Sequence, residues 1–269
     1  MWMPGSLDEF FLTAPPRLNQ PIHSPATTMN ATQQARIDLA AALRMAERLG
    51  LAEGVCNHFS VKLPGREDRL LVNPFGLHWS EVRASDLLVV DDQGTVMEGR
   101  GKVEKTALMI HAAVHRANRR AGCVLHTHMP HATALAVVDG GRLEPASQNA
   151  LRFHDDCAYD LAYNGLALDA TEGERLAEAL GDKRVLFLGN HGVIVVGPGV
   201  AQAFDDLYYL ERSCELQMLA MSTGLPLRRI PDEIARRTYQ EFNSTDSYAV
   251  AHFDAVKRIL RRECPDFEG

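Results

Sequence analysis

The segment CVLHTH, residues 123–128, places two histidines at the end of an apolar run. A short apolar run of this kind predicts a buried strand. In a strand, side chains at positions i and i+2 point to the same face of the sheet, so His126 and His128 are expected to project from one side. Two imidazoles so placed can bind one metal ion, although a buried histidine beside an exposed one would give the same pattern.

A third histidine, His191, lies in the segment LFLGNHGVIVVG, residues 186–197, between two apolar runs that predict strands. The flanking glycines, Gly189 and Gly192, allow a sharp turn and the close approach of another part of the chain. A histidine at the mouth of a sheet is suited to be a third metal ligand. The alternative is a hairpin turn whose histidine faces the solvent.

Helical and strand patterns alternate along most of the chain. Apolar residues recur with helical spacing in residues 32–50 and 102–120, whereas the segments HFSVKL, RLLVNP and LLVVDD predict short strands. Strands in adjacent hairpins, mixed with packing helices, predict one α/β domain over residues 31–269 with a largely antiparallel sheet and a C-terminal helical tail. Residues 1–30 contain five prolines, so we expect an extended or mobile N-terminal arm there.

The composition argues against some classes of partner. The net charge of the 269 residues is −7 at pH 7, so no basic surface for nucleic acid or for an anionic membrane is expected. No apolar run reaches the roughly 18 residues of a membrane-spanning helix. The five cysteines are spread along the chain without a Cys-x-x-Cys pair, which predicts reduced thiols and a cytoplasmic protein.

The order of these motifs resembles the class II aldolase/adducin family, and its adducin-like bacterial branch in particular. The resemblance extends from about residue 33 to 225 and includes GVCNHFSVKLPG and NPFGLHWSEVRASDLLVVD ahead of the histidines. It implies a three-layer α/β/α domain with a mainly antiparallel central sheet. It also implies a homotetramer with the site at a subunit interface, and a divalent ion, most often zinc, bound by His126, His128 and His191.

The chain departs from the sugar-phosphate aldolases of that family. Where they carry Ser-Ser-Glu before the His-x-His pair, this chain has Lys105, Thr106 and Ala107. The nearest acid, Glu104, is either a catalytic group or an ordinary first-turn acid favoured by the helix dipole. His111, further along the same predicted helix, is expected at the surface or behind the site rather than in catalysis.

The phosphate-binding loops of the family are also altered. They correspond here to GVCNHFS and to NPFG, which ends at Gly76, and the loss of small hydroxyl residues removes donors to a phosphate. Asn57, His58 and Lys105 could instead bind a carboxylate. We therefore expect a small carbonyl or carboxylate substrate.

These features predict a metal-dependent lyase that cleaves a hydroxy-carbonyl compound or decarboxylates an oxo-acid, with the ion stabilising an enolate. His58 is the first candidate for the proton donor, and Asp155 and Tyr159 are further candidates, because related enzymes take an acid or a tyrosine from a neighbouring subunit. One alternative is a non-catalytic assembly module like the adducin head. Another is a sugar-phosphate epimerase.

Overall fold

The computed structural model describes residues 30–166 and 170–269, so the predicted N-terminal arm lies outside the described residues, except for Asn30. The elements follow in the order α1 (Ala31–Arg48), β1 (His58–Leu63), β2 (Arg66–Val72), η2 (Ala84–Asp86), β3 (Leu88–Asp91), β4 (Val96–Glu98), α2 (Lys105–Ala117), β5 (Cys123–Thr127), α3 (Pro130–Val137), η3 (Asn149–Phe153), β6 (Cys157–Asp160), α4 (Ala170–Leu180), β7 (Val185–Leu188), β8 (Gly192–Gly197), α5 (Val200–Met221), α6 (Asp232–Phe242), α7 (Ser247–Glu263) and η4 (Pro265–Glu268). Here η denotes a 3₁₀ helix.

The strands form one sheet of eight strands in the order β4-β3-β2-β1-β5-β8-β7-β6. The sheet is mixed, which corrects the expectation of a mainly antiparallel sheet: β6 pairs with β7 in parallel, while the other neighbouring strands pair antiparallel. The reason lies in the connection. Helix α4 joins β6 to β7, and a crossover through a helix returns the chain in the same direction, unlike a tight hairpin.

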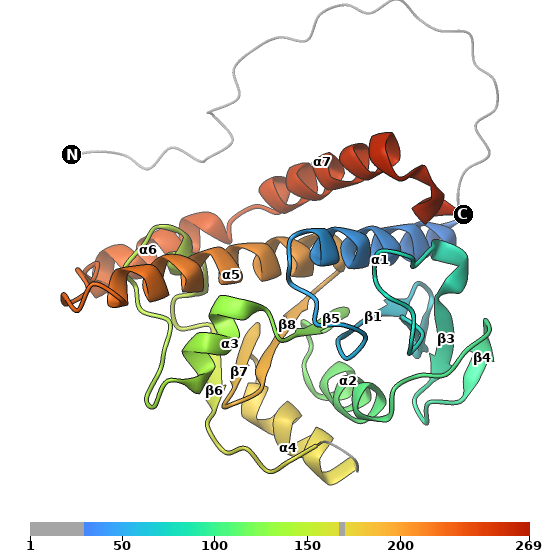
Figure 1. Cartoon of the computed structure of the whole chain (residues 1–269), viewed down its shortest axis with the longest axis horizontal. Helices are drawn as coiled ribbons and strands as arrows, with labels where there is room; N and C mark the ends of the chain where they lie inside the picture. Colours follow the sequence, from blue (N-terminus) through green and yellow to red (C-terminus); the bar gives the residue numbers. More distant parts are fainter. Residues whose placement is uncertain (1–29, 167–169) are drawn as a thin grey trace, which may run out of the picture.

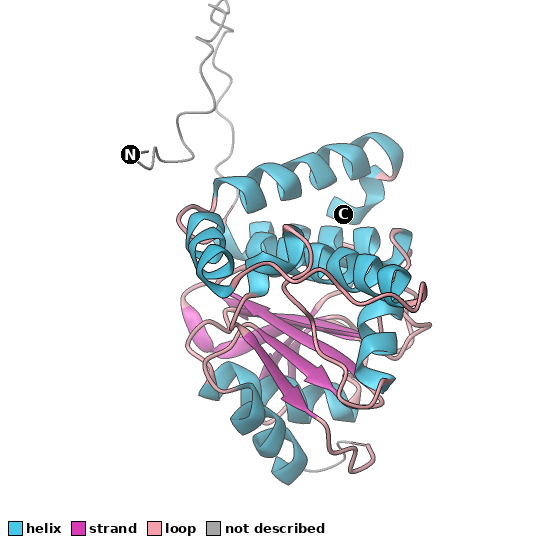
Figure 2. Ribbon diagram, turned by 90° about the vertical axis from the view of Figure 1, so that its left-hand side faces the viewer, coloured by secondary structure: helices cyan, strands magenta, loops and turns pink. Residues whose placement is uncertain are grey.

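Helices lie against both faces of the sheet (Figures 1 and 2). The long helices α1 and α5 cover one face, and the larger apolar core there includes Leu125 and Val195 of the central strands. Helices α2 and α4 cover the other face, where Val124 and Ile194 contribute to a second apolar core. Alternate residues of each central strand therefore belong to different cores, as the period of two in a strand requires.

This alternation decides which polar side chains meet. On β5, His126 shares the face of Val124, toward α2, because the two residues are two positions apart. On β1, His58 and Ser60 lie on the face opposite to Phe59, which is buried in the core beneath α1 and α5. The antiparallel register of β1 and β5 places His58 directly across from His126. Polar groups of two central strands thus gather under the start of α2.

No helix within the described ranges has both the length and the apolar character needed to cross a membrane.

Candidate active site

The three histidines chosen from the sequence meet at one end of the central strands. The ring centroids are 5.0 Å apart for His126 and His128, 4.9 Å for His126 and His191, and 4.8 Å for His128 and His191. One nitrogen atom from each of the three rings can be selected so that all three atoms lie within 4.8 Å of one another. The geometry therefore brings together residues that are more than 60 positions apart in the chain.

The turn that carries His191 depends on its neighbours. Asn190 has a left-handed backbone, with φ of 57°, which lets the chain reverse between β7 and β8. A Cβ atom on Gly192 would lie 2.6 Å from the carbonyl oxygen of Thr127 and 2.9 Å from Cδ2 of His128. Only glycine allows the turn to approach the end of β5 this closely, so the His-Gly pair serves the packing of the site.

Hydrogen bonds orient two of the rings. Nδ1–H of His126 donates to the carbonyl oxygen of Val193 at 3.0 Å. Nδ1 of His128 donates to the carboxylate of Glu53. In both rings Nε2 is therefore left with its lone pair, and Nε2 of His128 is buried without a hydrogen-bond partner among the described residues. A buried nitrogen lone pair without a donor is a position that a metal ion can occupy.

Burial keeps the rings of His126 and His191 neutral. It lowers the pKa of His191 to about 4, with a smaller contribution from His128, and it lowers the pKa of His126 well below the ordinary value. Neutral imidazole is the form that binds metal ions. Together with the unpartnered Nε2 of His128, these rings supply three imidazole nitrogens that would suit a divalent ion such as zinc, and three protein ligands is the number found in catalytic zinc sites.

Glu53 is absent from the residues predicted above. It lies before β1, its N–H donates to Oδ1 of Asn57 at 2.8 Å, and its carboxylate accepts from His128. A carboxylate that accepts from a metal-binding histidine fixes the ring and increases its basicity. The only signal in the sequence is an acidic residue shortly before the predicted strand, because the pairing of β1 with β5 is what brings the two side chains together.

His58 stacks on the ring of His126, with centroids 4.7 Å apart and planes inclined at 29°. Burial, and after it the neighbouring His128 and His191, lowers the pKa of His58 to about 3. Its Nε2 lies 3.9 Å from Oε2 of Glu104. The structure therefore places the predicted proton donor and the nearest acid beside the three histidines.

Glu104 caps its helix and also lies close to His58. It is the N-cap of α2, and its Oε2 accepts from the N–H of Ala107 at 2.9 Å and from the hydroxyl of Thr106. The same oxygen faces His58. Lys105, the first residue of α2, is exposed at this helix start, where the helix dipole favours an anion.

The two altered loops lie side by side. Oδ1 of Asn73, in the NPFG segment, accepts from the N–H of Phe59 at 2.9 Å, and its amide donates to the carbonyl of Asn57 at 3.4 Å. Nδ2 of Asn57 is buried and has no partner among the described residues, so it can donate to a ligand. Gly76 has φ of 93°, a conformation that favours glycine in this loop.

Asp155 and Tyr159 are not brought to the histidines of their own chain in the described structure. The hydroxyl of Tyr159 accepts from the N–H of Leu143 at 3.1 Å, and its ring stacks on Phe187. Asp155 lies beside His154 instead, with 3.4 Å between their polar atoms. A different tyrosine, the exposed Tyr163 a few residues further on, has its ring centroid 6.5 Å from that of His191.

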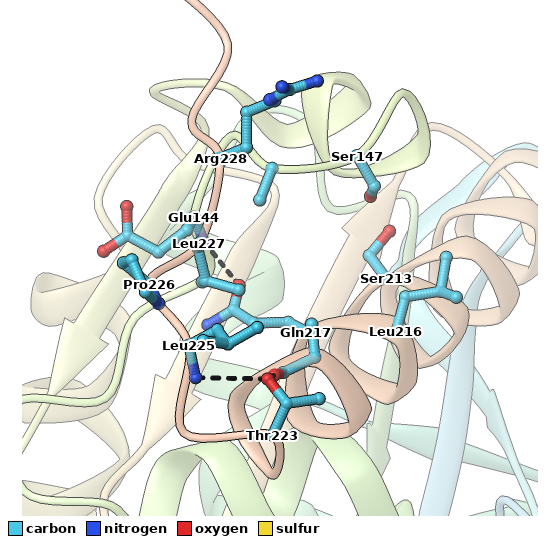
Figure 3. Close-up of a pocket in the computed structure, with 12 residues that line it drawn as sticks. Glu144, Ser147, Ser213, Leu216, Gln217, Thr223, Leu225, Pro226, Leu227 and Arg228 are labelled. Atoms are coloured by element: carbon cyan, nitrogen blue, oxygen red, sulfur yellow. Dashed lines mark hydrogen bonds between the residues drawn. The ribbon is translucent and has the colours of Figure 1, made fainter.

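The pocket drawn in Figure 3 is a separate feature. It lies between the end of α5 and the segment that follows α3, and Ser213, Gln217 and Leu225 are among the residues that line it. None of its lining residues belongs to the histidine cluster. A pocket next to the cluster is lined by Tyr163, Arg175 and His191.

Comparisons with known proteins point to one family of proteins. A model of the class II aldolase and adducin N-terminal domain matches residues 37–218. A Pseudomonas aeruginosa protein that its name assigns to aldolase class 2 is 38% identical over 215 residues, which are 80% of this chain and 82% of that protein. The decarboxylase NovR of Streptomyces niveus is 32% identical over 225 residues, covering 81% of this chain and 83% of that protein. The structure of an L-fuculose 1-phosphate aldolase from Glaciozyma antarctica PI12 has a TM-score of 0.77 and 26% identity, over 91% of this chain and 96% of that chain.

The chain therefore belongs to the class II aldolase and adducin family, which confirms the resemblance predicted from its motifs. Within that family it is of the class II aldolase type, as expected from the sequence.

Proposed function

We propose that the protein is a metal-dependent lyase that cleaves or decarboxylates a small hydroxy-carbonyl compound or oxo-acid. The observation that carries this proposal is the cluster of three imidazoles in which Nε2 of His128 is buried without a partner among the described residues. A family member that served only as an assembly module would have no need for this donor set, or for the carboxylate of Glu53 behind it.

His126, His128 and His191 would hold the ion, and zinc suits three imidazole ligands. When bound, the ion supplies Lewis-acid polarisation of a carbonyl group. The residues around it have separate tasks. His58 and Glu104 face the substrate from one side and would accept or return a proton at Nε2 and Oε2.

Substrate binding is proposed for Asn57, Lys105 and the loop at Gly76. The free amide donors of Asn57 and the ammonium of Lys105 at the start of α2 suit a carboxylate. The names of relatives cover both reaction types, one being a decarboxylase and one an L-fuculose 1-phosphate aldolase. We favour a carboxylate over a sugar phosphate, because the hydroxyl donors of the phosphate loops are missing.

We further propose that the chain works as a homotetramer in the cytoplasm. Exposed apolar side chains at the end of α5 and just after it, including Leu216, Leu219 and Leu225, support an interface between subunits. Asp155 and Tyr159 could then act only at the site of a neighbouring subunit. The five cysteines form no disulfide, in keeping with a reducing compartment.

The test begins with elemental analysis of the purified protein, followed by removal of the metal with a chelator and restoration with zinc, manganese or cobalt. Small hydroxy-acids and 2-oxo-acids are then assayed for release of an aldehyde or of carbon dioxide. We expect metal-dependent turnover that is lost in His126→Gln and His128→Gln but kept in His252→Gln, a control on α7. A protein that binds no divalent metal and turns over none of these acids would refute the proposal.

A further inference from the structure

A row of buried polar side chains leads away from the candidate site toward the far end of α2. Its members are His58 and Ser60 of β1 and His111 and His115 of α2, all at most 5% exposed. The successive hydrogen-bond distances are 2.7 Å from Nδ1 of His58 to Nε2 of His111, 2.5 Å from Nδ1 of His111 to Oγ of Ser60, 2.7 Å from that oxygen to Nε2 of His115, and 2.7 Å from Nδ1 of His115 to the carbonyl oxygen of Ala121. We call these groups the histidine chain.

The last hydrogen bond of the histidine chain fixes which atom is the donor in each of the other bonds. The carbonyl oxygen of Ala121 can only accept, so Nδ1 of His115 carries the hydrogen. Burial lowers the pKa of His115 to about 4, which leaves this ring neutral and its Nε2 with a lone pair. The hydroxyl of Ser60 must then donate to His115, and its oxygen accepts from Nδ1–H of His111.

The donor and acceptor at the other end of the histidine chain, between His58 and His111, follow in the same way. Burial also lowers the pKa of His111, so its ring is neutral and Nε2 is an acceptor. Nδ1 of His58 therefore carries a hydrogen and donates to it. The opposite direction would place a nitrogen lone pair against the carbonyl of Ala121 at 2.7 Å, and a buried polar atom that faces a like group costs free energy.

We propose that Ser60, His111 and His115 are positioning residues that present Nε2 of His58 to the substrate as a lone pair, and so select a ligand with a hydroxyl donor. This inference rests on the proposed function, because the selected hydroxyl belongs to the metal-binding substrate. Oε2 of Glu104, 3.9 Å from Nε2 of His58, is also an acceptor, since it already receives the hydrogens of Ala107 N–H and Thr106. Two acceptors at this separation favour a donor over a keto or deoxy group.

The first test reads the tautomers directly. Histidine side chains of the full-length protein are labelled with ¹⁵N, and long-range ¹H–¹⁵N spectra are recorded with and without zinc. Rings are assigned with single His→Gln variants. We expect Nε2 of His58, His111 and His115 to be unprotonated and Nδ1 to be protonated. A proton found on Nε2 of His58 in the unaltered protein would overturn the proposal.

The second test breaks the histidine chain at its centre. In Ser60→Ala, Nδ1–H of His111 loses its acceptor, so His111 should move its hydrogen to Nε2 and donate to His58. His58 should then carry its hydrogen on Nε2, where it can donate to Glu104. The matched control is Ser213→Ala, which removes a buried hydroxyl of α5 that donates to the carbonyl of Tyr209.

The change of tautomer in Ser60→Ala should alter the relative affinities for ligands with and without a hydroxyl group. Glycolate and acetate, which differ by one hydroxyl, are titrated into the zinc-loaded proteins. We expect the preference for glycolate to fall about tenfold in Ser60→Ala, the factor of one hydrogen bond, and to be unchanged in Ser213→Ala. The conservative Ser60→Thr keeps the hydroxyl and should restore the preference. An unchanged His58 tautomer and an unchanged preference in folded Ser60→Ala would overturn the inference.

The two proposals fail in different ways. Loss of the proposed function would show as absence of metal binding, which the histidine chain does not affect. Failure of the inference would show in the ¹⁵N spectra, which need neither metal nor turnover. If neither acid bound to the zinc-loaded protein, the selection of a hydroxyl ligand would be refuted even with the expected tautomers.

Discussion

His58 lies directly across from His126 in the ladder between β1 and β5, and their rings stack with centroids 4.7 Å apart. The two imidazoles differ in the partner of Nδ1. Nδ1 of His126 donates to the backbone of β8, whereas Nδ1 of His58 bonds to His111 on α2. The proposed metal ligand His126 and its neighbour His58 are therefore positioned by separate parts of the fold, although their rings are stacked.

Replacement of Glu53 by glutamine should weaken metal binding without unfolding the protein. Glu53 is largely exposed and its main contact is with His128, so the variant loses the charge that orients that ring and increases its basicity. Changes of this kind reduce metal affinity by about 10–100-fold. The measurement is competition for zinc with a chelating dye, with Glu67→Gln on an exposed part of β2 as the control. Equal affinities in the two variants would show that Glu53 does not support the metal site.

A methyl group at Gly192 should damage the site through packing. Its Cβ atom would lie 2.6 Å from the carbonyl oxygen of Thr127, so the turn that carries His191 must move away from β5. We expect Gly192→Ala to lower both the melting temperature and the affinity for zinc. Gly199→Ala is the matched control, because a Cβ atom there meets nothing within 4 Å. Normal zinc affinity in Gly192→Ala would contradict the structural role assigned to this glycine.

Local rules predict well that His126, His128 and His191 meet. The spacing of His126 and His128 in a strand places both on one side, and glycines around His191 allow a turn that reaches them. The predicted helix in residues 32–50 is present as α1, and Asn30 caps it by accepting from the N–H of Gln33 at 2.8 Å. These features depend on residues a few positions apart, so the sequence alone contains the information.

Features that depend on strand order are not predictable in this way. The contact of Glu53 with His128 requires β1 and β5 to be neighbours, although three strands, the 3₁₀ helix η2 and helix α2 lie between these two strands in the chain. The parallel pairing of β6 also requires the path of α4. The place of Tyr159 in the sequence predicts a role at the site, but its side chain lies on the packed side of β6, against Phe187.

Glu211 offers a test in which stability and metal binding separate. This buried carboxylate accepts from the N–H groups of His131 and Ala132, at 2.9 and 3.0 Å, and from Nδ1 of His131 at 2.8 Å. It therefore caps α3, whose N-cap, Met129, makes no side-chain cap hydrogen bond. We expect Glu211→Ala to lower the free energy of unfolding by about 1–3 kcal/mol, as for the loss of buried hydrogen bonds.

The measurement for Glu211 is urea unfolding, with zinc affinity determined on the same samples. Glu215→Ala, one turn further along α5, is the control and should change stability little, because its ion pair with Arg212 is on a more exposed part of the helix. A Glu211→Ala protein of normal stability would contradict the capping role. Loss of zinc affinity in a folded sample would mean that Glu211 supports the site as well.

The histidine chain makes stability depend on pH with a definite sign. Burial lowers the pKa of His115 from 6.5 to about 4, so between these values the unfolded chain binds a proton that the folded chain does not. The stability contributed by the neutral ring is complete above pH 6.5 and is lost as the pH falls toward 4, with a slope of up to about 1.4 kcal/mol per pH unit. The free energy of unfolding should therefore fall on acidification.

Replacing His115 by glutamine removes this titration. The difference in unfolding free energy between pH 7 and pH 5 should be smaller in His115→Gln than in the unaltered protein, both measured in urea with a chelator present, so that metal release contributes to neither. Because the variant also loses a buried hydrogen bond, its stability at pH 7 is expected to be lower. The shift of the ring proton of His115 gives an independent reading in the unaltered protein, and a midpoint near 6.5 would mean that this ring is not held neutral by burial.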